Sequence, residues 1–113
     1  MRLAIVGLGG SYSDFIAARI RSEKYDQVWG INCIGAIIHV DKTIMMDPVS
    51  RFLDTDNAGS QTNIAKEFLK KNTKPIITCE LDKRVKHLEE YPLEEVIKEL
   101  NLCYFNNTVA YAI

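Results

Sequence analysis

A continuous apolar run, Leu3–Val6, leads directly into the glycine-rich turn Gly7-Leu8-Gly9-Gly10. Such a run at strand length is typical of a strand that is buried on both faces, as in parallel sheets. Ser11 and Ser13 follow the turn and can cap a helix whose apolar positions repeat with a helical period. The N-terminus therefore predicts a strand, a tight turn and a helix, which is the repeating unit of α/β folds.

The same alternation continues along the chain. Further strands are predicted at Gln27–Ile31, Thr43–Met46, Pro75–Cys79 and Leu102–Phe105. Helices are predicted from Ser60, with Ser60 or Thr62 as its cap, and from Pro92 to Leu100, whereas Cys33–Val40 fits either a short helix or a strand edge. We therefore expect one domain over residues 1–113, with a three-layer Rossmann-like fold. Its mostly parallel five-stranded sheet is predicted in the order 3-2-1-4-5, with helices on both faces.

Composition excludes several classes of protein. The 14 Lys and Arg residues against 15 Asp and Glu give a net charge of −1, so nothing draws the whole chain to nucleic acid or to anionic lipid. The apolar runs are much shorter than a membrane span. Three cysteines in apolar stretches suit free thiols in a reducing compartment. We expect a soluble cytoplasmic protein without a nucleic-acid or membrane partner.

The glycine turn is the strongest candidate for a binding site. Gly7, Gly9 and Gly10 allow backbone amides to approach a phosphate closely, and Ser11 adds a hydroxyl at the helix start. The dinucleotide fingerprint is incomplete, because Tyr12 stands at its third glycine position and an acidic ribose-binding residue is missing after the second strand. NAD is therefore disfavoured. The alternative is that the glycines only form a tight turn.

Polar residues also follow other predicted strands. Asn32 and Asp47 each come just after a strand, at the edge that lines the ligand crevice of open parallel sheets. Asn32 suits a base edge or a sugar hydroxyl, and Asp47 could accept from a hydroxyl or hold a metal. Both also fit ordinary turn chemistry. Asn106, Asn107 and Thr108 follow the last strand, where plain helix capping is the alternative.

Other motifs are weaker. The cysteines and histidines have no zinc-ligand spacing, so a metal site is not expected from them, and the sequence indicates no particular cofactor. The basic run Lys83-Arg84-Val85-Lys86 is typical of a solvated face, although it could clamp a distal phosphate.

Taken in order, these motifs resemble two related groups, the family 42 bacterial sialyltransferases and the MptE-like Rossmann proteins, which include 6-hydroxymethylpterin diphosphokinases. The matching stretches are Gly7-Leu8-Gly9-Gly10-Ser11, Trp29-Gly30-Ile31-Asn32, Met46-Asp47-Pro48 and Asn106-Asn107-Thr108-Val109-Ala110. Gly10 stands where these groups have proline. Relative to them the chain is expected to be incomplete at its C-terminus, since the region of the sialyltransferases' catalytic histidine has no counterpart.

The resemblance implies a nucleotide or nucleotide-sugar ligand. Gly7, Gly9, Gly10, Ser11 and Asn32 would line the nucleotide pocket, and Asp47 would face the transferred group as the candidate catalytic residue. Asn107 and Thr108 would contact phosphate or ribose.

Three functions stay open at this point. The first is a Rossmann-like nucleotide-binding protein related to these transferases, for which catalysis is left open. The second is a small glycosyl- or diphosphotransferase that is completed by oligomerisation. The third is a non-enzymatic interaction module that has lost its ligand. The apolar segment Val109–Ile113 is expected to form a subunit contact, giving a homo-oligomer.

Overall fold

A computed structural model describes residues 1–10, 12–21, 24–56 and 59–101 of the chain. Within these residues, five parallel strands form one sheet. They are β1 (Leu3–Val6), β2 (Gln27–Ile31), β3 (Lys42–Met45), β4 (Ile76–Thr78) and β5 (Leu88–Glu90). The prediction of an α/β fold with a parallel five-stranded sheet is confirmed.

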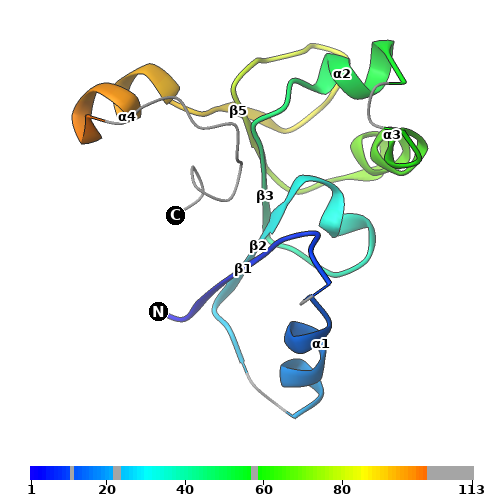
Figure 1. Ribbon diagram of the computed structural model, residues 1–113, viewed down its shortest axis with the longest axis vertical. Helices are drawn as coiled ribbons and strands as arrows, with labels where there is room; N and C mark the ends of the chain where they lie inside the picture. Colours follow the sequence, from blue (N-terminus) through cyan, green and yellow to red (C-terminus); the bar gives the residue numbers. More distant parts are fainter. Residues whose placement is uncertain (11, 22–23, 57–58, 102–113) are drawn as a thin grey trace.

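Helices lie on both faces of the sheet, as predicted. They are α1 (Tyr12–Ile20), the 3-10 helix η1 (Asn32–Ala36), α2 (Val49–Asp54), α3 (Gln61–Lys71) and α4 (Leu93–Leu100). Figure 1 shows α1, α2 and α3 on one side of the strands and α4 on the other. The segment that fitted either a helix or a strand edge thus begins as a 3-10 helix.

The predicted strand order was wrong. Among the described residues the strands follow one another in chain order, β1-β2-β3-β4-β5, so β1 pairs with β2 and does not pair with β4. The sequence could not decide this, because right-handed crossovers are compatible with either direction of growth from β3. The fifth strand also differs: β5 forms in a charged stretch, whereas the predicted strand Leu102–Phe105 lies outside the described residues.

The core lies between the sheet and the helices of one face. Residues that share this face across the central strands include Val28, Met45 and Ile76, which are all buried. Phe52 from α2 and Phe68 from α3 belong to one buried cluster with Met45 and Ile76, whereas Val28 belongs to a second cluster. Every second side chain of these strands therefore packs between the sheet and the helices. Because the strands are parallel, their carboxyl ends lie at one edge of the sheet.

Helix α3 forms for the expected reason but starts differently. Its buried positions include Ala65, Phe68 and Leu69, which recur at helical spacing, and basic residues occupy its last turn. Ser60 is the residue at the N-cap position, yet its side chain makes no capping hydrogen bond. Thr62 is buried inside the helix instead. The predicted side-chain cap is therefore not formed.

Within the described part of the chain, no helix is both long enough and apolar enough to span a membrane.

Candidate functional site

The glycine turn after β1 leaves space and donors at the carboxyl edge of the sheet. A Cβ placed on Gly7, Gly9 or Gly10 would meet no atom within 4 Å, and none of the three has a left-handed φ. Neither packing nor backbone conformation therefore requires glycine here. Among the described residues, nothing accepts a hydrogen bond from the amides of Leu8, Gly9 or Gly10. Such amides beside open space are suited to an anion.

The start of α1 is tied back to this turn. The amide of Tyr12 donates to the carbonyl of Gly9 at 3.1 Å, and the amide of Ser13 donates to Gly10 at 3.4 Å. The Ser13 hydroxyl also donates to the Gly10 carbonyl, at 3.1 Å, so it does not cap the helix amides as predicted. Asp14 lies in the first turn, where its charge already complements the helix dipole. The amides of Tyr12 and Ser13 are thus already bonded, whereas those of Leu8, Gly9 and Gly10 are available within the described structure.

Asn32 combines an unusual backbone with an unpartnered side-chain atom. It follows β2 directly and has a left-handed φ of 52°, a conformation that asparagine tolerates better than most residues. Its Oδ1 is buried and has no hydrogen-bond partner within the described structure. Buried acceptors are nearly always paired, so an unpaired one beside a candidate site indicates a missing donor.

Asp47 lies just past β3 and is already engaged. Its Oδ1 accepts a hydrogen bond from Arg51 Nη1 at 3.0 Å, an ion pair across one turn of chain. The predicted position at the carboxyl edge is confirmed by the end of β3 at Met45. The sequence did not indicate the Arg51 partner, which neutralises the carboxylate.

Cys79 is a residue that the motif search missed at this edge. It follows β4, and its Sγ donates to the carbonyl of Met46 at 2.8 Å. Burial raises the pKa of the Cys79 thiol, and the negative charges of Glu80 and Asp47 raise it further. The rule that identified Asn32 and Asp47, a side chain just after a buried strand, passed over Cys79 because the predicted strand Pro75–Cys79 included it, whereas β4 ends at Thr78.

The strand order determines which of these residues are neighbours. Asn32 follows the strand next to β1, so it lies beside the glycine turn. Asp47 follows β3, two strand spacings from β1, or about 10 Å across the sheet. Ser11, Asn107, Thr108 and the segment Val109–Ile113 lie outside the described residues.

The basic run does not offer a free guanidinium. Arg84 donates to both carboxylate oxygens of Asp54, at 2.7 and 2.9 Å, and to both oxygens of Asp82, at 2.7 and 3.0 Å. These hydrogen bonds lower the pKa of Asp54 and lower that of Asp82 to about 2. Arg84 therefore fastens the loop before β5 to the end of α2 rather than facing a phosphate.

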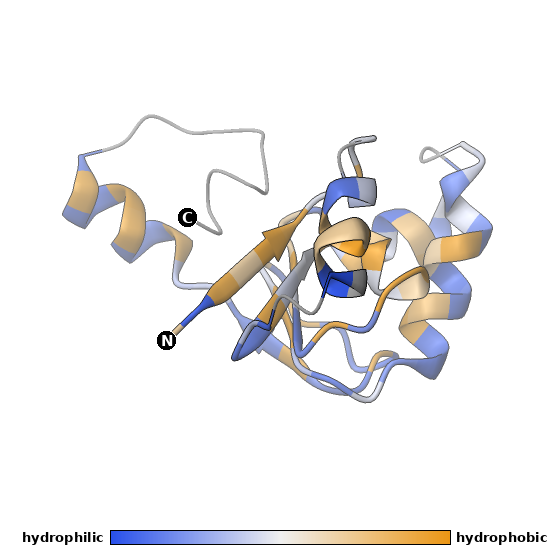
Figure 2. Cartoon of the chain, turned by 90° about the horizontal axis from the view of Figure 1, so that it is seen from below, coloured by the Kyte–Doolittle hydropathy of each residue, from blue (hydrophilic) through white to orange (hydrophobic). Residues whose placement is uncertain are grey.

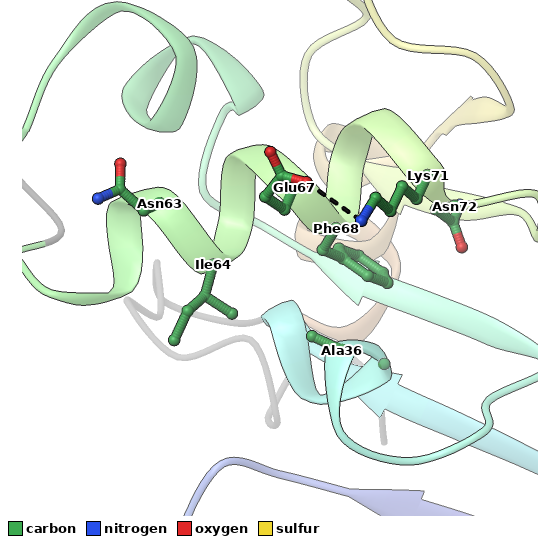
Figure 3. Close-up of a pocket in the computed structure, with 8 residues that line it drawn as sticks. Ala36, Asn63, Ile64, Glu67, Phe68, Lys71 and Asn72 are labelled. Atoms are coloured by element: carbon green, nitrogen blue, oxygen red, sulfur yellow. Dashed lines mark ion pairs between the residues drawn. The ribbon is translucent and has the colours of Figure 1, made fainter.

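A separate open groove of about 540 Å³ lies between η1 and α3. Figure 3 shows Ile64 and Phe68 of α3 directed toward Ala36, with the Glu67–Lys71 ion pair above them. This groove contains none of the residues that the sequence singled out. Among the described residues, no group of three His, Cys, Asp or Glu side chains could hold a metal ion.

Comparison with known proteins does not add a relative: no protein-family model, no curated protein and no solved structure matches this chain.

Proposed function

We propose that this protein binds a nucleotide or nucleotide-sugar at the carboxyl edge of its sheet. The buried, unpartnered Oδ1 of Asn32 is the observation on which the proposal chiefly rests. In this arrangement Oδ1 accepts a hydrogen bond from an amino group of the base or from a ribose hydroxyl. A ligand donor would satisfy this acceptor, which has no partner within the described residues.

The glycine turn supplies the complementary half of the site. The amides of Leu8, Gly9 and Gly10 donate to phosphate oxygens, and the open space at the glycines lets the phosphate approach the backbone. No cationic side chain is assigned to the phosphate, because Arg51 and Arg84 are both paired with carboxylates. We therefore expect weak binding, with a Kd of about 10 µM to 1 mM.

The proposal is restricted to binding. A transferase would need a base or a metal ligand near the transferred group, and the carboxylate of Asp47 is held by Arg51. By the resemblance given above, Ser11, Asn107 and Thr108 are proposed as further contacts to the ligand.

Calorimetric titration with CMP, GTP and ATP tests the proposal. Wild-type protein is expected to bind at least one of them, and Gly9→Val is expected to lose at least about tenfold in affinity, since its side chain fills the space beside the amides. A Cβ at Gly9 meets no atom within 4 Å, so the variant should keep its fold by circular dichroism. Wild-type protein that binds none of the three nucleotides at millimolar concentration would remove the proposal.

Asn32→Gly separates a ligand contact from a structural role. Glycine adopts the left-handed backbone without strain and removes the unpaired oxygen, so the free energy of unfolding should stay level or rise by up to about 1 kcal/mol. Nucleotide affinity should fall. Thr73→Val, at an exposed position before β4, is the matched control and should change neither quantity. Unchanged affinity in Asn32→Gly would show that Oδ1 does not contact the ligand.

A further inference from the structure

The outer edge of β1 is unpaired within the described structure. The amides of Asp26 and Gln27 donate to the carbonyl of Arg2, so Arg2 and every second residue after it direct their backbone groups toward β2. The amides and carbonyls of Leu3 and Ile5 consequently face outward. A groove of about 430 Å³ runs along this edge, between β1 and the side chains of Phe15 and Ala18 of α1. Figure 2 shows β1 running from the N-terminus along the near edge of the sheet, with apolar colouring.

The two edges of the sheet differ in their protection. Strand β5, at the far edge, carries Glu89 and Glu90, and exposed charges of this kind discourage a further strand from pairing. Strand β1 contains no charged residue and no proline between Leu3 and Val6. An unprotected apolar edge of this kind is normally covered in the folded protein. The β1 edge is therefore the one suited to accept another strand.

Helix α4 indicates where that strand comes from. It lies on the face opposite α1, α2 and α3 (Figure 1), and its apolar residues Val96 and Ile97 are only half-buried while Leu100 is 61% exposed. The connections that run over the face covered by α1, α2 and α3 carry the chain in the direction from β1 to β5. A right-handed connection through the opposite face must run the other way, from β5 back toward β1. A parallel strand reached from β5 by such a right-handed connection would therefore lie beside β1, whose outer edge is unpaired among the described residues.

We propose that Leu102–Phe105, which the sequence predicts as a strand, docks in parallel on the outer edge of β1, with α4 as the crossover. This proposal concerns how the chain completes its own sheet and does not depend on ligand binding. It would make β1 the point at which the strand order reverses, which is where open α/β sheets bind ligands. Asn107 and Thr108 would then follow a strand adjacent to the glycine turn, which would complete the proposed nucleotide site.

Alignment of the carboxyl ends gives the register. If Phe105 is opposite Val6, then Cys103 is opposite Ala4 and shares its face of the sheet. Neighbouring residues on paired strands have Cα atoms about 5 Å apart, which is within the range of a disulfide. Ala4→Cys should therefore form an intramolecular disulfide with Cys103 under mild oxidation, identified by peptide mass spectrometry. Leu3→Cys, which projects to the opposite face, should react at least about tenfold more slowly.

The controls separate this docking from its rivals. Cys103→Ser in the Ala4→Cys background should abolish the product. A disulfide between two molecules would overturn the proposal in favour of a second copy at this edge, and equal reaction from Leu3→Cys and Ala4→Cys would overturn the register and parallel docking. No disulfide from either variant would overturn it as well. A disulfide without nucleotide binding would leave the docking in place while removing the proposed function, so the two ideas fail separately.

Hydrogen exchange in the full chain provides an independent measurement. The outward amides of Leu3 and Ile5 should exchange at least about tenfold more slowly than unpaired amides, because they are bonded to the docked strand. Phe105→Pro removes the amide that this register directs at the carbonyl of Ile5 and should restore fast exchange at Leu3 and Ile5, while amides between β2 and β3 stay protected. Fast exchange of Leu3 and Ile5 in the wild-type chain would refute the docking.

Discussion

The side chain of Ile34 lies so close over Gly30 that a Cβ at residue 30 would be 2.6 Å from Ile34 Cγ2. The same Cβ would be 2.8 Å from Val40 Cγ1. Both neighbours are buried, so neither can move away without disturbing the core. Only glycine therefore fits at residue 30, because the segment that follows β2, which includes η1, folds back over it.

Gly30→Ala should consequently destabilise the protein. We expect a loss of about 1–3 kcal/mol in the free energy of unfolding, because the added methyl group overpacks the site. Gly10→Ala is the matched control, since its Cβ meets no atom within 4 Å, and it should change stability by less than about 0.5 kcal/mol. Urea denaturation measures both values. Equal effects in the two variants would contradict the packing argument.

Thr43→Val should stabilise the sheet. Thr43 in β3 is fully buried, and its Oγ1 has no partner within the described structure. Valine has nearly the same shape and lacks the unpaired hydroxyl, so the free energy of unfolding should rise by about 1 kcal/mol. The midpoint of thermal unfolding reports the change. A lower midpoint would mean that the hydroxyl has a partner, such as an ordered water.

Arg84→Gln should change the response to acid. The hydrogen bonds from Arg84 lower the pKa of Asp82 to about 2, and the folded value lies below the usual 3.8. A carboxyl group with a depressed pKa stabilises the fold above its unfolded pKa and loses that contribution as the pH falls toward the folded value. Arg84→Gln should therefore be less stable than wild type at pH 7, and the difference should shrink as the pH falls from 3.8 through about 2.

Titration of Asp82 by NMR checks the same contact directly. Its pKa should move from about 2 toward 3.8 in the Arg84→Gln variant. A value that stays near 2 would show that another donor holds the carboxylate.

The thiol of Cys79 should react slowly at neutral pH. Burial and then the charges of Glu80 and Asp47 raise its pKa, so little thiolate is present. The rate of alkylation should therefore reach its plateau at a higher pH than it does for an ordinary cysteine. Asp47→Asn removes one of these charges and should shift that inflection to lower pH. The reaction of the buried Cys33, whose pKa burial also raises, is the internal comparison. A faster reaction at Cys79 than at a free thiol would contradict this environment.

Much of the fold follows from local patterns. The continuous apolar runs at Leu3–Val6 and Gln27–Ile31 became strands, and the amphipathic stretch ending at Lys71 became α3. Two elements escaped prediction for physical reasons. Helix α2 is short and starts after Pro48, and β5 is an edge strand whose glutamates mark solvent exposure rather than burial.

The candidate site was partly predictable. The rule that residues after parallel strands gather at one edge placed Asn32 and Asp47 correctly. It could not foresee the pairing of Asp47 with Arg51, which depends on the start of α2, or the left-handed backbone of Asn32. It also assumed that β1 pairs with the fourth strand, whereas β4 pairs with β3 and β5. Handedness alone permits either order, so only the three-dimensional structure assigns the neighbours of β1.

The succession β1-β2-β3-β4-β5 has a consequence for how the polypeptide is made. Each described strand from β2 onward pairs with the one synthesised just before it, and the longest connection closed in this way runs from Met45 of β3 to Ile76 of β4. The described strands β1 to β5 can therefore pair in order from the N-terminus while the ribosome is still translating. Assembly of these five strands should be directional.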